Sequence, residues 1–186
     1  SKVVDKKHAE EFGELLIQDS KGRTKPIYTF ASDILRKISR KDKIYGLTPA
    51  QIFLEMQVDP QTWMNIPLIK ISNKHIREKL NIQGKYARYT DFVLPQQGYL
   101  MQGMVDMVYA KPPADRNKTD KAIIKIDERV NICYAMFSGT YLRILPSNDS
   151  TMHGWQSPNE AYQFANNKKD SAFLRDVIPV YLGEIV

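Results

Sequence analysis

The chain has 186 residues, a length that suits one domain. Hydrophobic residues make up 42% of it and charged residues 26%, which excludes wholesale disorder and provides enough apolar surface for a packed core. The net charge of +6 permits contact with anionic headgroups, carboxylates or nucleic acid without requiring any of them.

The ends of the sequence and its single thiol add two expectations. No apolar run approaches the roughly 20 residues that span a bilayer, and no signal peptide is visible. The chain starts abruptly and stops within an apolar pattern at Val186, so we expect a single domain, residues 1–186, excised from a longer protein. One cysteine, Cys133, cannot form an internal disulfide or a CxxC redox pair.

Two helices with a turn between them are predicted near the start of the chain. Residues 6–17 form the first, with an inward face of Ala9, Phe12, Leu15 and Leu16. A polar turn follows, where Gly22 is expected to take a positive φ and the residues up to Pro26 to be extended. The second helix has an apolar face at helical spacing, made by Ile27, Phe30, Ala31, Ile34, Leu35 and Ile38.

The middle of the chain is less regular. Thr48, Pro49 and Gln51 predict a strong helix start, because a capping threonine, a proline at the first position and a reciprocal glutamine satisfy free backbone groups. Further along, we expect a short turn carrying Trp63 and then a helix capped by Ser72. The remaining expectations are an extended segment at 67–71 and a helix over 98–109, while residues 84–94 could form a strand, a short helix or a loop.

The longest periodic segment is residues 119–141. Its apolar seam consists of Ile123, Ile126, Val130, Cys133 and Phe137. Ser157 and Glu160 predict a second capping box, and a last helix is expected from Ser171. With no hairpin signal, the sequence predicts a mainly α, compact multi-helix domain with at most a few short strands; the alternative is α+β.

Four segments together resemble one family. They are the pattern GR-x-KP-x-x-T from Gly22 to Thr29, the helix ending ILRKISRKD, the run DERVNICYAMFSG, and a tryptophan-containing polar loop before an S-P-x-E helix start. In these segments the chain resembles the extracytoplasmic region of fused ResB–CcsA proteins, the membrane proteins of system II cytochrome c maturation.

That resemblance implies a location and a role. The chain would be a non-catalytic domain at the periplasmic face of the inner membrane, held there by segments outside this sequence. It would act as a scaffold or docking module for apocytochrome c and the outer haem site while the full complex attaches haem covalently. The resemblance implies that the full-length protein handles haem and that this part binds no cofactor.

The densest charge feature extends from Lys21 to Lys43. A functional interpretation is contact with phospholipid headgroups, haem propionates or an acidic partner; a solvated helix face is the commoner case. Asp19, Asp33 and Asp42 dilute the positive field, and we favour a structural role for Arg23, pinning the turn through backbone carbonyls. The residues predicted to bind a partner or headgroup are Arg23, Lys25, Arg36, Lys37, Arg40 and Lys41.

The candidate ligands and nucleophiles are few. His8, His75 and His153 are the speculative haem ligands, but they lie far apart and show no metal-ligand spacing, so surface histidine is the commoner interpretation. Cys133 lies on the apolar seam and is predicted to be buried and inert. No catalytic motif and no metal site are predicted.

Two other function classes remain as alternatives. A basic helical chain permits a nucleic-acid-binding module, but no helix–turn–helix with a polar recognition helix stands out, so we expect no nucleic acid partner. A free enzyme would require Cys133 to meet a distant histidine in the fold.

Overall fold

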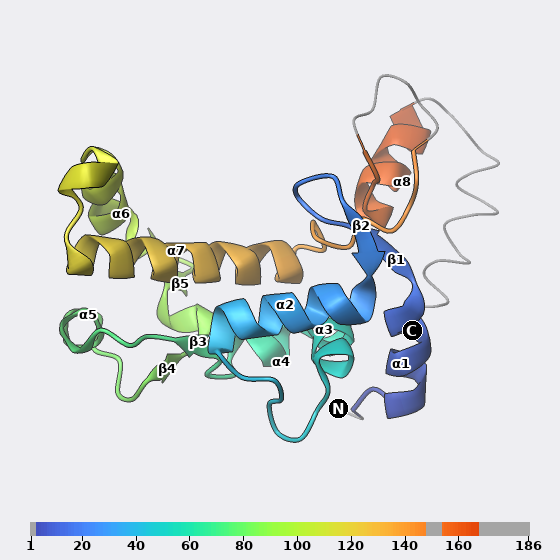
Figure 1. Cartoon of the computed structure of the whole chain (residues 1–186), viewed down its shortest axis with the longest axis horizontal. Helices are drawn as coiled ribbons and strands as arrows, with labels where there is room; N and C mark the ends of the chain where they lie inside the picture. Colours follow the sequence, from blue (N-terminus) through green and yellow to red (C-terminus); the bar gives the residue numbers. More distant parts are fainter. Residues whose placement is uncertain (1–2, 148–153, 168–186) are drawn as a thin grey trace. The chain divides into compact units, whose positions relative to one another are not determined.

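The computed structural model describes residues 3–147 and 154–167, and within them the fold is mainly α, as predicted (Figure 1). The strands form two-stranded antiparallel sheets, β1–β2, β3–β4 and β5–β6. In the described ranges, no helix combines the length and the apolar character that a membrane crossing requires.

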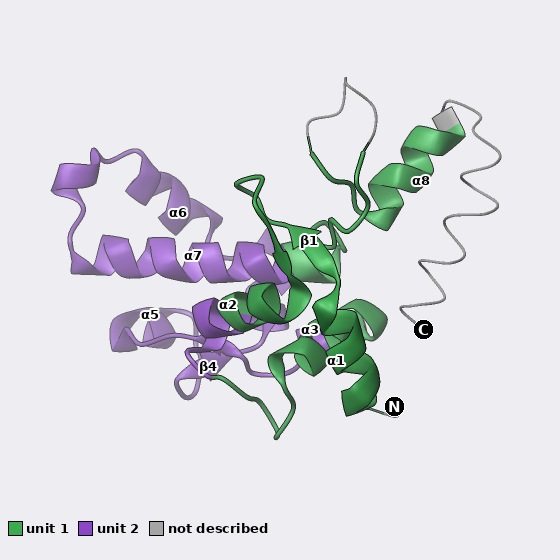
Figure 2. Ribbon diagram, turned by 45° about the vertical axis from the view of Figure 1, so that its right-hand side comes forward, with its two compact units in different colours: residues 1–34, 42–60, 135–186 green, residues 35–41, 61–134 purple. Residues whose placement is uncertain are grey.

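The chain separates into two compact units (Figure 2). Unit 1 is drawn from residues 1–34, 42–60 and 135–186, and unit 2 from residues 35–41 and 61–134. Three of the four boundaries fall inside helices: α2 (Ile27–Ser39), α4 (Pro60–Met64) and α7 (Lys118–Phe137). That the whole chain is one domain stays a prediction.

Unit 1 begins with α1 (Lys6–Glu14), whose cap is Asp5: its carboxylate accepts hydrogen bonds from the backbone N–H of the second and third helical residues. The predicted extension of this helix to residue 17 is wrong. Leu15 is already extended, and β1 (Leu16–Gln18) pairs with β2 (Thr24–Pro26). Alternation along β1 leaves Leu16 exposed and buries Ile17, and Leu15, the C-cap of α1, is exposed as well.

The helices of unit 1 pack through small and aromatic residues. Gly13 lies where a Cβ would come 3.3 Å from the Cβ of Tyr28, so a close approach explains a glycine inside a helix. Phe30 makes edge-to-face contacts with Phe53 and Tyr141, at centroid distances of 5.9 and 5.7 Å. The predicted inward residues of α2 are all buried: Ile27, Phe30, Ala31, Ile34, Leu35 and Ile38.

Both predicted capping boxes are confirmed. Helix α3 (Pro49–Val58) begins with the reciprocal Thr48–Gln51 pair. At α8 (Pro158–Asn167), the Ser157 N–H donates to the Glu160 carboxylate at 2.7 Å, and the Glu160 N–H donates to the Ser157 hydroxyl at 3.3 Å. The helix predicted from Ser171 lies outside the described residues.

Unit 2 contains most of the short elements, with α4 at its boundary with unit 1. In chain order they are α4 (Pro60–Met64), β3 (Ile69–Lys70), α5 (Lys74–Lys79), β4 (Tyr86–Ala87), the 3-10 helix η1 (Tyr89–Asp91), β5 (Val93–Leu94), β6 (Gly98–Tyr99), α6 (Gln102–Tyr109), the 3-10 helix η2 (Pro113–Asp115) and most of α7. Trp63 is buried, and the segment predicted to be extended, residues 67–71, contains the strand β3 at Ile69–Lys70.

Two predictions in this unit need correction. Asn73, not Ser72, caps α5, because its carbonyl oxygen accepts the Ile76 N–H at 3.1 Å. The predicted helix over 98–109 begins only at Gln102, since Gly98, at φ 67°, closes the β5–β6 hairpin. The β5–β6 and β1–β2 hairpins have no Asn-Gly or Asp-Gly pair in their turns. Their strands are only two or three residues long, too short for apolar alternation to predict them.

Helix α7 is the longest element and matches its predicted seam closely. Ile123, Ile126, Val130 and Cys133 are buried, whereas Phe137 is only half-buried at the end of the helix. The start of the helix is held by a reciprocal pair, Asn117 and Asp120, with N···O distances of 2.9 and 3.0 Å. This long helix presents one side of the candidate site.

Candidate functional site

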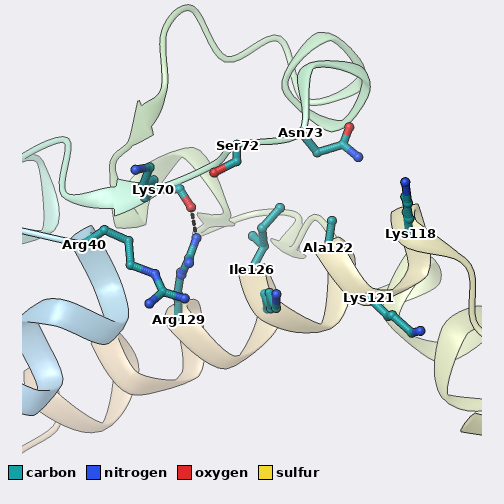
Figure 3. A pocket seen from close by; sticks show the side chains of 10 residues that line it. Arg40, Lys70, Ser72, Asn73, Lys118, Lys121, Ala122, Ile126 and Arg129 are labelled. Atoms are coloured by element: carbon teal, nitrogen blue, oxygen red, sulfur yellow. Dashed lines mark hydrogen bonds between the residues drawn. The ribbon is translucent and has the colours of Figure 1, made fainter.

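Unit 2 contains a pocket of about 720 Å³ with a strongly basic lining (Figure 3). Three segments form it: the residue after α2, the connection from β3 to α5, and one face of α7. Among the described residues, six of the lining side chains are cationic and none is acidic. The lining residues are Arg40, Lys70, Ser72, Asn73, Lys118, Lys121, Ala122, Lys125, Ile126 and Arg129.

Helical spacing places four of these cations in a row. Lys118, Lys121, Lys125 and Arg129 are three or four residues apart, so they share a face of α7. At 1.5 Å per residue the row is about 16 Å long. Ala122 and Ile126, which lie between these cations in the sequence of α7, also line the pocket. The α7 side of the pocket is therefore charged along its length, with two aliphatic residues among the cations.

Arg129 is the fixed point of the pocket. Its side chain is only 8% exposed, its Nε donates to the backbone carbonyl of Lys37 at 2.9 Å, and its Nη1 donates to the backbone carbonyl of Lys70. Burial and the positive charge of Arg40 lower the pKa of Arg129, but a guanidinium stays charged at neutral pH. No carboxylate pairs with it in the part of the chain that the structure describes.

Arg40 shares the Arg129 end of the pocket (Figure 3). Its φ of 60° ends the helical path of α2, while its N–H still bonds the carbonyl of Arg36 at 3.0 Å. The guanidinium itself has no carboxylate partner among the described residues. Two arginines therefore concentrate positive charge at this end, and Lys118 and Lys121 do so at the other (Figure 3).

Two of the predicted binding residues belong to a different network, in unit 1. Arg23 donates from Nε and Nη2 to the Asp19 carboxylate at 3.1 and 2.9 Å, and Lys25 lies 3.5 Å from the same carboxylate. Lys25 also pairs with Asp33 at 3.2 Å, and Gly22 takes the expected positive φ of 78°. Arg23 therefore pins the turn as predicted, through a carboxylate instead of backbone carbonyls.

Asp19 is the centre of that turn. It is 7% exposed and accepts hydrogen bonds from the backbone N–H groups of Lys21 and Arg23 at 2.9 and 3.0 Å. Burial alone would raise the pKa of this carboxyl, but these hydrogen bonds and the Arg23 guanidinium outweigh it and lower the pKa to about 2.

The other predicted basic residues belong to unit 2 but do not form one surface. Arg36 and Lys37 are exposed on α2, and Lys37 contributes only its carbonyl, to Arg129. The Lys41 ammonium lies 4.3 Å from the centroid of the Tyr86 ring, a cation–π contact. Of the six predicted residues, Arg40 is the one that lines the pocket.

Five pocket cations were missed by the sequence-based prediction. Lys118, Lys121, Lys125 and Arg129 carried a usable signal, because their three- and four-residue steps fall on a helix that was itself predicted. Lys70 carried none: it lies in a short strand, and only tertiary structure brings it to α7.

The histidines are not brought together. His8 lies on α1 of unit 1, half-buried, and its Nε2 has no hydrogen-bond partner among the described residues. His75 lies on α5 of unit 2, exposed, at a separate pocket of about 180 Å³ that Met104 and Met107 also line. His153 lies outside the described residues. In the described ranges, no three His, Cys, Asp or Glu side chains form a potential metal site.

The segment DERVNICYAMFSG has structural roles. Asp127 accepts a hydrogen bond from the Tyr99 hydroxyl at 2.9 Å, and burial together with that bond raises the pKa of Tyr99. Arg129 is the pocket anchor described above. Cys133 is fully buried, as predicted, and burial raises the pKa of its thiol, which disfavours the reactive thiolate.

Comparison with known proteins finds similarity to a longer protein. No family model matches the chain. Over 151 residues it is 32% identical to Protein NrfI of Wolinella succinogenes, which covers 81% of this chain and 17% of that protein. The chain thus corresponds to a small part of this longer relative, and the match supports a relationship to cytochrome c biogenesis.

Proposed function

We propose that this chain is an extracytoplasmic docking module of a system II cytochrome c maturation protein. It engages apocytochrome c and supports the outer haem site while the full membrane complex attaches haem covalently. The module lies at the periplasmic face of the inner membrane, and segments outside this sequence anchor it. The chemistry of ligation belongs to other parts of the protein.

The similarity to NrfI and the four sequence segments that resemble fused ResB–CcsA proteins support this proposal. Because the chain spans 17% of NrfI, the activity of the whole protein and its partners are part of the proposal. The segment DERVNICYAMFSG supplies Arg129 to the basic pocket of unit 2, which links the resemblance to the candidate site.

The observation that carries docking is the excess of cationic over acidic side chains in the pocket. Six cations line it, no acidic side chain does, and a buried arginine is held there without a carboxylate partner in the described part of the chain. Such a concentration of one sign of charge attracts an oppositely charged partner and orients it as it arrives. The pocket therefore has the electrostatics of a binding surface.

Haem is assigned to the full-length protein and not to a ligand set in this chain. His8 and His75 belong to different units, and neither shares a described cluster of metal-ligating side chains. Basic side chains at the pocket can still help to hold an anionic partner close to a haem bound elsewhere in the complex.

The proposal is tested in the full-length protein with charge reversals. Lys121→Glu combined with Lys125→Glu reverses two exposed pocket lysines. The matched control is Lys6→Glu with Lys7→Glu, which makes the same change in net charge on α1. We measure capture of apocytochrome c and the yield of cytochrome carrying covalently bound haem. The pocket variant is expected to lower both at least fivefold, and the control neither.

Equal capture and equal maturation in the pocket variant and the α1 control would remove the pocket from the proposed function. Binding of haem by the 186-residue chain, followed by its absorption spectrum and abolished by His75→Ala, would contradict the assignment of haem to other parts of the protein.

A further inference from the structure

We infer that the basic pocket binds an extended acidic segment of a polypeptide, with acidic side chains at alternate positions. This inference rests on the proposed function in one respect, that the partner is a polypeptide. It specifies which chemical groups of that partner the pocket residues bind. A compact anion such as phosphate is a poorer match, for the reasons that follow.

The length of the cation row suits a chain of about five residues. The row from Lys118 to Arg129 is about 16 Å long. An extended peptide advances about 3.3 Å per residue, and its alternate side chains point to the same side, about 7 Å apart. Three acidic side chains at alternate positions would therefore lie along the row, each facing one or two cations.

The two arginines provide a prearranged anchor at one end. Arg129 is held by two backbone carbonyls, so its orientation is already fixed and little side-chain freedom is lost on binding. Arg40 has no carboxylate partner among the described residues, and its fork of N–H groups matches a carboxylate in a two-point contact. A carboxylate at this end would meet both guanidinium groups.

The uncharged lining fits a peptide better than a nucleic acid. The half-buried Ala122 offers aliphatic surface to the methylene groups of acidic side chains, whereas Ile126 is almost fully buried. Asn73 uses its carbonyl oxygen to cap α5, which leaves its amide N–H groups to donate to a peptide carbonyl. The lining includes no aromatic side chain, whereas single-stranded nucleic acids are bound by stacking on aromatic rings.

The hydrogen bonds of β3 argue against binding by addition of a strand. The Lys70 carbonyl already accepts from Arg129, and β3 pairs with β4 through Ile69 and Lys70. A peptide could not use this carbonyl to add a strand to the sheet. Recognition therefore depends on side-chain charge, and we expect it to weaken steeply as salt rises.

The test uses the 186-residue chain and fluorescently labelled peptides, with binding followed by anisotropy. One peptide carries three glutamates separated by single alanines; its isomer carries three consecutive glutamates and has the same composition and charge. We expect the alternating peptide to bind at least fivefold more tightly than the isomer. Raising the salt from 50 to 300 mM should weaken it at least tenfold.

Variants locate the binding. Lys121→Glu with Lys125→Glu should weaken the alternating peptide at least tenfold, while the α1 control, Lys6→Glu with Lys7→Glu, should change it less than twofold. Circular dichroism verifies that each variant is folded. Equal binding of the two isomers, tighter binding of a single-stranded DNA of matched charge, or displacement of the peptide by equimolar pyrophosphate would each overturn the inference.

The inference and the proposed function can fail separately. If the peptide binds as described but the pocket variant matures cytochrome c normally, the pocket is an acidic-peptide site with another role. If maturation falls in that variant while neither peptide binds, the docking function stands and the extended-segment geometry is wrong.

Discussion

Two clusters of basic residues in this chain have opposite electrostatic environments. In the β1–β2 turn of unit 1, Arg23 and Lys25 share the Asp19 carboxylate at 2.9 and 3.5 Å, and Lys25 also pairs with Asp33. In unit 2, six cations line one pocket, and no acidic side chain of the described residues lines it. The turn satisfies its charge internally, whereas the pocket leaves its charge available to a partner.

The comparison teaches that the position of counter-ions, and not the density of basic residues, separates the structural cluster from the candidate binding site. A salt-bridged turn contributes to folding because its charges are satisfied within the chain. An unmatched pocket repels itself before a ligand arrives, and an anionic ligand removes that repulsion. The predictions below test each half of this contrast, from the largest expected effect to the smallest.

Arg129→Met should cause the largest loss of stability. It removes the donors to two backbone carbonyls, those of Lys37 and Lys70, and an unsatisfied buried acceptor costs roughly 1–3 kcal/mol. We expect the free energy of unfolding in urea to fall by about 2–4 kcal/mol. Arg40→Met removes a positive charge from the same pocket but no side-chain hydrogen bond to a backbone carbonyl. It should change the free energy of unfolding by less than about 1 kcal/mol. Similar losses in both variants would show that Arg129 acts only as a charge.

Asp19→Ala should have the next largest effect, because this carboxylate accepts two backbone N–H groups and the Arg23 guanidinium. We expect a loss of about 1–3 kcal/mol in the free energy of unfolding. The matched control is Asp33→Ala, whose carboxylate is 55% exposed in its ion pair and should cost no more than about 0.5 kcal/mol. If the control loses as much stability as the variant, the turn does not depend on the buried acceptor.

The same carboxylate predicts the pH dependence of this turn. Because the folded-state pKa of Asp19 is lowered to about 2, its contribution is complete above the unfolded value of about 3.9 and is lost as the pH falls through about 2. The stability difference between the wild-type protein and Asp19→Asn should therefore be constant from pH 5 to 7 and shrink between pH 4 and 2. Urea unfolding at each pH measures this difference; a constant difference down to pH 2 would refute the low pKa.

Reversing exposed pocket lysines should have the smallest effect on folding. Lys121 and Lys125 are exposed and form no ion pair among the described residues, so Lys121→Glu with Lys125→Glu should change the free energy of unfolding by less than about 0.5 kcal/mol. Relief of repulsion can even raise stability slightly. A loss above 1 kcal/mol would show that these lysines stabilise the fold, as the basic residues of the β1–β2 turn do, and would argue against a binding role.

Local patterns predicted much of the helical structure. The Thr48–Gln51 and Ser157–Glu160 capping boxes form because their partners lie three residues apart, so the hydrogen bonds need no distant segment. The apolar faces of α2 and α7 are buried as their spacing predicted. The first helix was overextended because Leu15 and Leu16 continue a helical pattern, although the chain at that point pairs with β2.

By itself, the sequence determined the mainly helical fold, the capping residues, the φ of Gly22 and the burial of Cys133, because each depends on neighbours one helical turn away or on local apolar periodicity. Tertiary structure alone decided which basic residues are neutralised and which line a pocket. Arg40, Lys70 and Arg129 are separated by tens of residues, and the sign and strength of their interactions depend on through-space distance and burial, which the order of residues does not contain.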